Sequence, residues 1–233
     1  MKIYGIKLIQ ENEKDKLHYL MNFISKEKSI RISRYRRWED FQRSLLSDVL
    51  IRSMIHRNFG IPNDKLLFKT NEYGKPYLMN SNIYYNISHS GEWVICVMNE
   101  TSPVGIDIEE VKIIDFSVAK QFMTEKEYNK FEQLDDVTKQ NYFYKVWTTK
   151  ESYIKADGRG MNIPLDIIET NFSKNGNIQV SINALESKCY FNQFKLEKCY
   201  LITVCSAFQN LTDKIEIINI DEIVHELKVC TEL

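Results

Sequence analysis

The stretch "SPVGIDIEEV", residues Ser102–Val111, alternates aliphatic side chains with glycine and acids. Side chains of a β-strand point to opposite faces in turn, so this pattern predicts a strand with two different faces. The apolar face holds Val104, Ile106 and Ile108. The other face holds Gly105, Asp107 and Glu109. By the same alternation Glu110 points with the aliphatic residues and is not expected to join the other two acids.

A third acid comes from the segment "NYFYKVWTTKESYIKADGRG", Asn141–Gly160, which predicts a helix over 138–157 closed by Gly158 and Gly160. Residues four apart lie on one helix face, so this helix presents an aromatic side chain, a carboxylate and an ammonium along one line. They are Trp147, Glu151 and Lys155.

Strand and helix together predict a metal site. Residues on one face of a strand are roughly 7 Å apart, so Asp107 and the longer Glu109 can converge on one cation. With Glu151 they form a set of carboxylate ligands suited to Mg²⁺, which shares its ligation with substrate phosphate. Two plain alternatives remain open: a half-buried strand with a solvated acidic face, and an ordinary surface Glu–Lys helix pair.

A phosphate-binding region is predicted in "KEKSIRISRYRRW", Lys26–Trp38. Its only acid is Glu27, and its six basic residues are Lys26, Lys28, Arg31, Arg34, Arg36 and Arg37. Further donors are expected in two turns, from Lys75 in "YGKP" and from Ser88, His89 and Ser90 in a polar loop. The alternatives are a solvated basic helix end and a histidine with only a structural role.

The remaining pattern predicts an α+β fold with two similar subdomains, 1–103 and 104–233, each combining helices with an antiparallel sheet. In the first subdomain we expect a strand over 2–9, a helix within 11–25 and a long helix over 38–59. Two strands then follow within 84–100. In the second we expect helical segments over 115–123 and 125–134 before the 138–157 helix. The last part reads as strands, over 178–184, 189–196, 200–208 and 214–220.

Composition limits the classes of partner. Thirty-one basic and thirty-two acidic residues leave a net charge of −1, which argues against a nucleic-acid partner or an anionic membrane surface. No window approaches the roughly 18 apolar residues of a membrane span, and the N-terminal residues do not resemble a targeting signal. The five cysteines are odd in number and mostly lie in apolar runs, which favours a reduced, cytoplasmic protein. They are Cys96, Cys189, Cys199, Cys205 and Cys230.

The motifs resemble the 4′-phosphopantetheinyl transferases, in particular the surfactin-type branch. "VGIDIEEV" and "WTTKESYIKADGRG" match the paired signature of that family. "FISKEKSIRISRYRRWEDFQRSLLSDVLIRS", "YGKPY" and "NISHSGEWVICV" extend the match in order along the chain. The resemblance implies an α/β-type sandwich of two subdomains related by a pseudo-two-fold axis, in a monomer that binds coenzyme A in the cleft between them.

The implied reaction moves the phosphopantetheine arm of coenzyme A to a serine of an apo acyl or peptidyl carrier protein. Adenosine 3′,5′-bisphosphate is released. Carried onto this chain, the resemblance places the Mg²⁺ ligands at Asp107, Glu109 and Glu151. Glu151 and Lys155 become the catalytic residues. The resemblance further implies that the coenzyme A phosphates, especially the 3′-phosphate, are bound by Lys28, Arg31, Ser44, Lys75, Ser88, His89 and Lys155. Related enzymes often have lysine at the position of Arg31 and threonine at that of Ser44.

Carrier proteins are acidic around the modified serine, so a basic or apolar surface beside the cleft is expected to receive them. The segment Phe116–Phe131 is the candidate, because it lies between the two signatures and mixes apolar residues with lysines. Two other functions stay open: a non-catalytic nucleotide or nucleic-acid binding module, and a Mg²⁺-dependent phosphohydrolase. The first needs aromatic residues between the basic ones, and only Tyr35 and Trp38 stand there.

Overall fold

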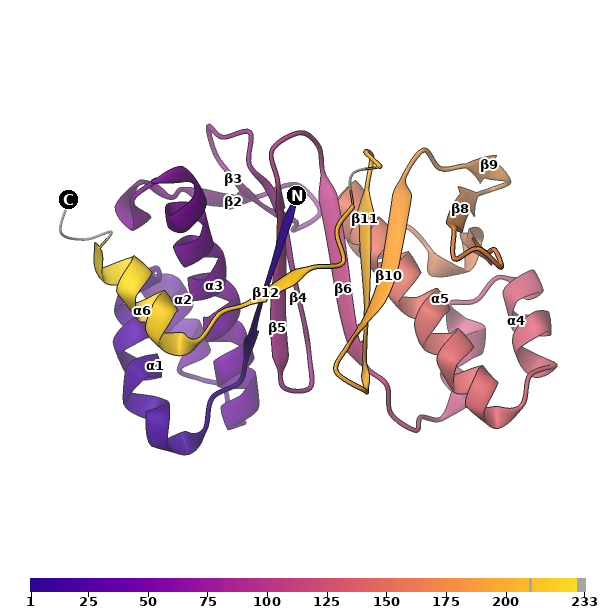
Figure 1. The fold of residues 1–233 in the computed structure, drawn as a ribbon, viewed down its shortest axis with the longest axis horizontal. Coiled ribbons are helices and arrows are strands. Elements are labelled where there is room, and N and C mark those ends of the chain that lie inside the picture. The colour runs from indigo at the N-terminus through magenta and orange to yellow at the C-terminus, as the bar shows by residue number, and fades with distance from the viewer. Residues whose placement is uncertain (210, 230–233) are drawn as a thin grey trace.

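A computed structural model describes residues 1–209 and 211–229. Figure 1 shows two sheets in the middle of the molecule and helices on both outer flanks. The first half contains β1 (Lys2–Lys7), α1 (Lys14–Leu20), α2 (Lys26–Ile32), α3 (Trp38–Phe59), β2 (Phe68–Thr70), β3 (Pro76–Leu78), β4 (Tyr84–Ser90) and β5 (Trp93–Asn99). The second contains β6 (Val104–Glu110), α4 (Glu125–Glu132), α5 (Asp136–Asp157), β7 (Ile168–Phe172), β8 (Ile178–Ile182), β9 (Leu185–Glu186), β10 (Tyr190–Leu196), β11 (Tyr200–Ser206), β12 (Ile215–Ile217) and α6 (Ile220–Val229).

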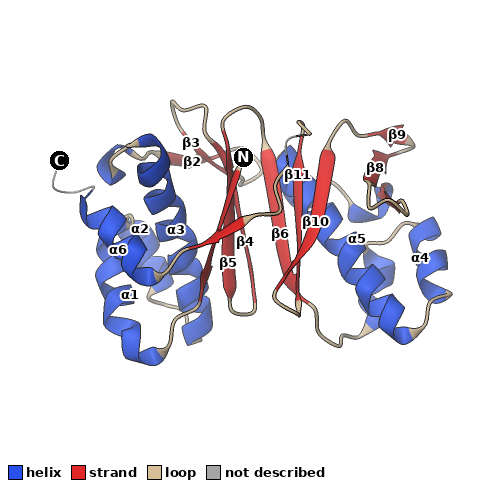
Figure 2. Cartoon of the chain, in the orientation of Figure 1, coloured by secondary structure: helices blue, strands red, loops and turns tan. Residues whose placement is uncertain are grey.

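The two main sheets share one plan. Their strand orders are β12-β1-β5-β4 and β10-β11-β6, so in each half the first strand lies beside the last strand of an antiparallel hairpin. A 22-residue helix precedes that hairpin in both halves, as α3 and as α5. Figure 2 shows these helices on the outer faces of the two sheets. The predicted α+β class with two similar subdomains is confirmed.

The two long helices form where the sequence predicts them. Helix α3 has the predicted bounds, and its apolar stripe from Leu45 to Met54 is buried. It ends because Gly60 adopts the left-handed conformation at φ 65°, which glycine reaches without steric cost. Helix α5 starts two residues before its predicted range, where the Asp135 side chain accepts a hydrogen bond from the Thr138 amide. Gly158, at φ 94°, ends it.

The shorter helices depart more from expectation. The segment 11–25 forms α1 flanked by single 3-10 turns, Glu11–Glu13 and Met21–Phe23, rather than one helix. The segment 115–123 forms a 3-10 helix, Phe116–Gln121. Helix α4 begins at the predicted residue, Glu125, because Thr124 and Glu127 form a capping box there.

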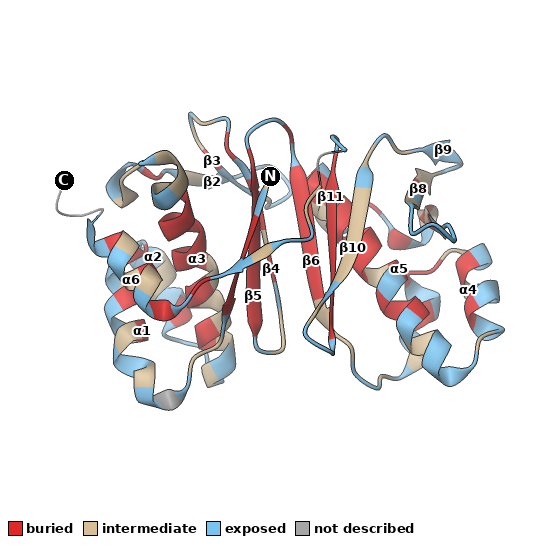
Figure 3. Cartoon of the chain, viewed as in Figure 1, coloured by how far each residue is buried: buried red, intermediate tan, exposed pale blue. Residues whose placement is uncertain are grey.

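Three apolar clusters hold these layers together. One lies between α3 and the first sheet, and a second lies between α5 and the second sheet. The third joins the inner faces of the two sheets and contains Ile95 of β5, Val104, Ile106 and Ile108 of β6, and Ile202 of β11. Figure 3 shows these inner strands and the faces of α3 and α5 as buried. The aliphatic face predicted for the 104–110 strand is therefore the inter-sheet face.

The C-terminal segment returns to the first half. Strand β12 pairs in parallel with β1, and α6 packs on α3. Helix α6 was missed in the sequence, although Ile220, Ile223 and Leu227 have helical spacing and are buried. The apolar side chains of Ile218, Ile220, Ile223 and Leu227 thus join the core of the first half, although the predicted boundary at residue 103 assigns them to the second subdomain.

Four of the five cysteines lie in the described residues, and all four are free thiols there. Cys96 and Cys205 are buried, Cys189 is half-buried and Cys199 is exposed, while Cys230 lies outside the described residues. Among the helices described, none combines the length and the apolar character needed to cross a membrane.

Candidate active site

Helix α5 lies directly against β6 because residue 105 is glycine. A Cβ atom at Gly105 would stand 2.0 Å from the Ser152 carbonyl oxygen and 2.5 Å from the Ala156 nitrogen, both on α5. These distances are far below any tolerated contact with backbone atoms, so only glycine permits this approach. The approach places Glu151 and Lys155 over the acidic face of β6.

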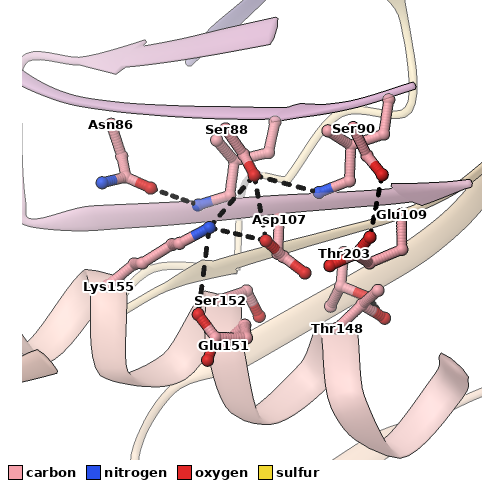
Figure 4. Close-up of polar contacts among 12 residues, drawn as sticks. Asn86, Ser88, Ser90, Asp107, Glu109, Thr148, Glu151, Ser152, Lys155 and Thr203 are labelled. Carbon is pink, nitrogen blue, oxygen red and sulfur yellow. Dashed lines mark hydrogen bonds and ion pairs between the residues drawn. The ribbon is translucent and has the colours of Figure 1, made fainter. Parts of the chain in front are cut away.

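Asp107 is the most buried acid of the group, with 3% of its surface exposed. Its Oδ1 accepts hydrogen bonds from Ser88 Oγ at 2.9 Å and from Lys155 Nζ at 2.5 Å (Figure 4). Burial raises the pKa of Asp107, against the opposing effects of Lys155 and Ser88. An ammonium and a hydroxyl thus compensate part of the cost of burying this carboxylate.

Glu109 is held by two neighbours. Ser90 Oγ donates to Oε2 at 2.8 Å, and Trp147 Nε1 donates to Oε1 at 3.0 Å. Burial raises the pKa of Glu109, and the nearby Asp107 charge raises it further. The predicted line of Trp147, Glu151 and Lys155 on α5 therefore reaches both acids of the strand.

Glu151 completes the group. Its Oε2 lies 4.0 Å from Lys155 Nζ. Burial, together with the charges of Asp107 and Glu109, raises the pKa of Glu151 to about 7, although Lys155 opposes the shift. A carboxyl with this pKa can exchange a proton near neutral pH. Glu110 stands apart from these acids and pairs with Lys112 at 2.6 Å.

The three acids offer part of the ligand set that a divalent cation needs. As the described side chains stand, no three Asp, Glu, His or Cys residues are grouped as a metal cage. Lys155 occupies Asp107 Oδ1, and Ser90 and Trp147 occupy Glu109. However, Asp107 Oδ2 and Glu151 Oε1 are buried and accept no hydrogen bond from any described residue. Unsatisfied carboxylate oxygens in a cluster of three acids have the donor chemistry that Mg²⁺ prefers.

Strand β4 supplies polar side chains to the edge of β6. Asn86 Oδ1, Ser88 Oγ and Ser90 Oγ accept the amide hydrogens of Ile106, Ile108 and Glu110 at 2.9, 3.4 and 3.0 Å. Figure 4 shows the bonds of Asn86 and Ser88 to this strand beside the acids. The prediction of a polar loop at 88–91 was wrong: residues 88–90 are the end of β4, and the turn is Gly91–Glu92. Pairing with β5 fixes this segment as a strand despite its turn-forming residues.

A basic cavity of about 290 Å³ opens on the other side of β4. Four of the predicted phosphate-binding residues line it, namely Lys28, Arg31, Ser44 and His89. Burial lowers the pKa of His89, and the charges of Arg43 and Lys155 lower it further. Because Ser88 contacts Lys155 and His89 follows it in the chain, this cavity adjoins the acidic cluster.

Lys75 lies at the C-terminal end of α5 and not in the basic cavity. Its Nζ donates to the Ala156 carbonyl oxygen at 3.0 Å, and Asn71 Nδ2 donates to the Gly158 carbonyl oxygen at 2.9 Å. The β2–β3 hairpin thus caps the C-terminal end of α5, where a cation is favoured. Burial lowers the pKa of Lys75 to about 8. Lys75 is not among the residues that line the basic cavity.

Two family models match the segments that carry the acidic cluster and the basic cavity. The family model described as 4′-phosphopantetheinyl transferase superfamily matches residues 103–205, and the model 4′-phosphopantetheinyl transferase, N-terminal, matches residues 11–101. The chain is 36% identical to the 4′-phosphopantetheinyl transferase Sfp of Bacillus subtilis over 225 residues, which cover 96% of this chain and 100% of that protein.

The chain belongs to the 4′-phosphopantetheinyl transferase family. It is also 36% identical to the transferase gsp of Aneurinibacillus migulanus, over 89% of this chain and 86% of that protein. Among solved structures, the holo-ACP-synthase from Plasmodium yoelii aligns with a TM-score of 0.38 at 21% identity, over 45% of this chain and 91% of that one.

Sequence reasoning about this transferase missed several site residues. Arg43 and Asp48 line the basic cavity, and Asn86 bonds to the strand that carries the acids. A signal for Asp48 was present, because Asp40, Ser44, Asp48 and Arg52 recur every four residues on α3 and form a polar stripe. Arg43 lies outside that stripe. For Asn86 no sequence signal exists, since its partner Ile106 is set by the packing of the halves.

Glu109 also borders an apolar hollow of about 590 Å³. Its walls are formed by the segment around the 3-10 helix Phe116–Gln121, by α5 and by the loop that follows α5. They include Val118, Phe122, Trp147 and Met161. Of the predicted docking segment Phe116–Phe131, much of the apolar content is core, since Phe122 and Phe131 are buried. Val118 remains exposed at the rim of the hollow.

Proposed function

We propose that this transferase moves the 4′-phosphopantetheine group of coenzyme A to a serine hydroxyl of an apo acyl or peptidyl carrier protein. The serine oxygen forms a bond to the β-phosphorus, the bond from that phosphorus to the bridging oxygen breaks, and adenosine 3′,5′-bisphosphate leaves. The observation that carries the proposal is Lys155, which contacts both Asp107 of the acidic cluster and Ser88 beside the basic cavity. One ammonium thus connects a region for cations with a region for phosphates.

The basic cavity is proposed to take the phosphates of coenzyme A, and the 3′-phosphate in particular. Lys28, Arg31 and His89 supply charge or ring N–H donors there, and Ser44 supplies a hydroxyl. Arg31 can bind a phosphate with two parallel hydrogen bonds, which a lysine cannot. Ser88 is proposed to contact the pyrophosphate rather than this cavity, because its hydroxyl faces Asp107 and Lys155. Lys75 remains a proposed phosphate contact from the hairpin side.

Asp107, Glu109 and Glu151 are the proposed ligands of Mg²⁺. The two unsatisfied oxygens of Asp107 and Glu151 support this assignment. When bound, the ion neutralises charge on the phosphate oxygens during transfer. Lys155 is proposed to stabilise the charge that develops on the pyrophosphate, since it already lies at the acids.

Glu151 is the proposed acceptor of the serine proton, directly or through a water. Without a bound cation, burial and the neighbouring acids raise its pKa to about 7. A bound Mg²⁺ would lower this pKa, which keeps the carboxylate ionised and able to accept a proton. With the boundary at residue 103, most of the proposed phosphate contacts lie in residues 1–103. The proposed metal site and the catalytic helix α5 lie in residues 104–233.

The carrier protein is proposed to dock over the segment Phe116–Phe131 and the apolar hollow beside Glu109. Because Glu109 lines the hollow, this position would bring the carrier serine to the acids. A monomer in the cytoplasm, acting on carriers of nonribosomal peptide or antibiotic synthesis, is the proposed setting. The free cysteines support the location.

The test is a carrier modification assay. The protein, coenzyme A, Mg²⁺ and an apo peptidyl or acyl carrier are mixed, and the intact carrier mass is measured. A gain of roughly one phosphopantetheine is expected. Asp107→Asn, which keeps the side-chain size, is expected to lower turnover about 10³-fold with little change in melting temperature. Unchanged masses for several carrier types would exclude the proposed reaction.

A further inference from the structure

Lys28 reaches the basic cavity while it is ion-paired to a buried acid on α3. Its Nζ lies 3.0 Å from Oδ2 of Asp48, whose side chain is 5% exposed, whereas that of Lys28 is 39% exposed. The separation is that of an ion pair, but Asp48 Oδ2 accepts no hydrogen bond from the described residues, so the angle is not that of a hydrogen bond. The opposite charges thus keep the Lys28 ammonium close to Asp48.

The other side of Asp48 is fixed. Arg52 Nε donates to Asp48 Oδ1 at 2.9 Å, and Arg52 Nη1 donates to Asn63 Oδ1 at 3.0 Å. The guanidinium stacks over the Phe68 ring at 4.8 Å. Asn63 in turn donates to the Phe23 carbonyl oxygen at 2.9 Å. Arg52 therefore neutralises Asp48 from within the core and leaves the Lys28 charge available to an anion.

We propose that Asp48 is a positioning residue that holds the Lys28 ammonium on the wall of the basic cavity, ready for the phosphate of coenzyme A that enters there. The inference rests on the proposed function. A lysine has a long flexible side chain that loses freedom when it binds, and ordering it beforehand reduces that loss. Asp48 itself lines the cavity, so the order is imposed at the place where the anion binds.

A purely structural role explains only half of this arrangement. Arg52 alone balances the charge of Asp48, and its stacking on Phe68 and bond to Asn63 account for its burial. The second cation is not needed for folding, since the Lys28 side chain is substantially exposed and can be solvated. The Lys28–Asp48 contact therefore serves the cavity that both residues line.

The test separates binding from turnover. Asp48→Asn keeps the side-chain size and an oxygen for Arg52 but removes the charge that holds Lys28. With coenzyme A as substrate, KM is expected to rise about tenfold while kcat stays within about twofold of wild type. With 3′-dephospho-coenzyme A, which lacks the phosphate assigned to this cavity, KM is expected to be the same in variant and wild type.

A double-mutant cycle asks whether Asp48 acts through Lys28. Lys28→Met is expected to raise KM for coenzyme A at least as much as Asp48→Asn does. Adding Asp48→Asn to Lys28→Met should have no further effect. Additive effects, or equal increases of KM for the two substrates, would overturn the proposal.

Asn63→Ala is the matched control, because it removes a bond from the same network at the end away from Lys28. It is expected to lower the melting temperature without changing the ratio of the two KM values. If Asp48→Asn does not fold, Asp48→Glu keeps the charge for Arg52 while shifting it, and the same selective rise in KM is expected. An unselective effect of Asp48→Glu would equally contradict the proposal.

Two different measurements distinguish failure of the proposed function from failure of the role of Asp48. A wild-type protein that does not modify any carrier excludes that function. The role of Asp48 is then decided by calorimetric binding of adenosine 3′,5′-bisphosphate, for which Asp48→Asn is expected to weaken binding about tenfold and Asn63→Ala is not. Equal binding by Asp48→Asn and wild type would refute the positioning role in either case.

Discussion

The two halves of the molecule place opposite chemistry at the same position of a shared plan. In each half, one face of the first strand packs under the long helix. In the first half this face presents Tyr4 and Ile6, which are buried in one apolar cluster with α3. In the second half it presents Gly105 and Asp107 under α5. The first half thus uses the contact as core, and the second uses it as a site.

The long helices differ in the same way. Each carries a buried cation eight residues before its terminal glycine, Arg52 before Gly60 and Lys150 before Gly158. The next residue is Ser53 in α3, whose hydroxyl bonds to its own helix, and Glu151 in α5. Since the scaffold tolerates both, the acids of the second half are not required by the fold. They are kept at the cost of desolvation, which their raised pKa values record.

The largest effect is expected from the two buried cations. Lys150 is fully buried and donates to Glu127 at 2.6 Å and to the carbonyl oxygens of Phe122 and Leu165. Lys150→Met leaves the buried Glu127 charge without a cation and should lower the free energy of unfolding by about 3–5 kcal/mol. Arg52→Met should cost only about 1–2 kcal/mol, because Asp48 retains Lys28. Urea denaturation measures both, and equal losses would contradict this asymmetry.

The next effect compares the two strand glycines. Gly105→Ala places a methyl group against the backbone of α5, which cannot move without disturbing Glu151, and should cost about 3 kcal/mol. Gly5→Ala is the matched control, because its Cβ would meet the Ile215 side chain at 3.3 Å, and a side chain can adjust. The control should change stability by less than about 1 kcal/mol. Similar melting temperatures for the two variants would show that α5 can shift away from β6.

Long periodic segments account for what the sequence could predict. The alternation in 104–110 placed Asp107 and Glu109 on one face, and the helical spacing in α5 brought Glu151 and Lys155 to them. Both patterns are local, and each covers at least two repeats of its period. Together the two patterns predicted a Mg²⁺ site, and the run of basic residues over 26–38 predicted a phosphate-binding region. The family resemblance then added Ser44 and the catalytic roles of Glu151 and Lys155.

Contacts between distant segments account for what was missed. Residues 88–90 have turn-forming character, and only their pairing with β5 makes them strand. The return of β12 to β1 depends on pairing across more than 200 residues of chain, for which no local signal exists. The Lys28–Asp48 pair likewise joins two helices whose relative placement is a property of the assembled core.

A smaller effect tests how the edge of β6 is held. Strand β1 has backbone partners on both sides, β12 and β5, whereas β6 has a backbone partner only in β11 among the described strands. Its other edge is bonded by side chains of β4. Asn86→Ala leaves the buried amide of Ile106 without an acceptor and should cost about 1–2 kcal/mol. Hydrogen exchange at the Ile106 amide should accelerate in the variant, and unchanged protection would mean that another acceptor replaces Asn86.

The smallest effect concerns the ends of the long helices. Nothing lies within 4 Å of a Cβ built at Gly60, whereas one at Gly158 would meet Lys75 Cδ at 3.1 Å, because the β2–β3 hairpin covers the end of α5. Burial lowers the pKa of Lys75 to about 8, against about 10.4 for a free lysine. Between these values the unfolded chain binds more protons at this side chain than the folded one does, so its contribution to the free energy of unfolding rises with pH.

Below pH 8 both states hold the proton, and the cost of burying the ammonium is fully present. The stability of the wild type relative to Lys75→Met should therefore increase between about pH 8 and pH 10, when the two are compared by urea denaturation at constant ionic strength. Lys7→Met is the control, because Lys7 lies exposed between Glu92 and Glu197 and its pKa is raised by these partners. Curves for wild type and Lys75→Met that run parallel across this range would mean that Lys75 is hydrated in solution, and that the hairpin does not seal the end of α5.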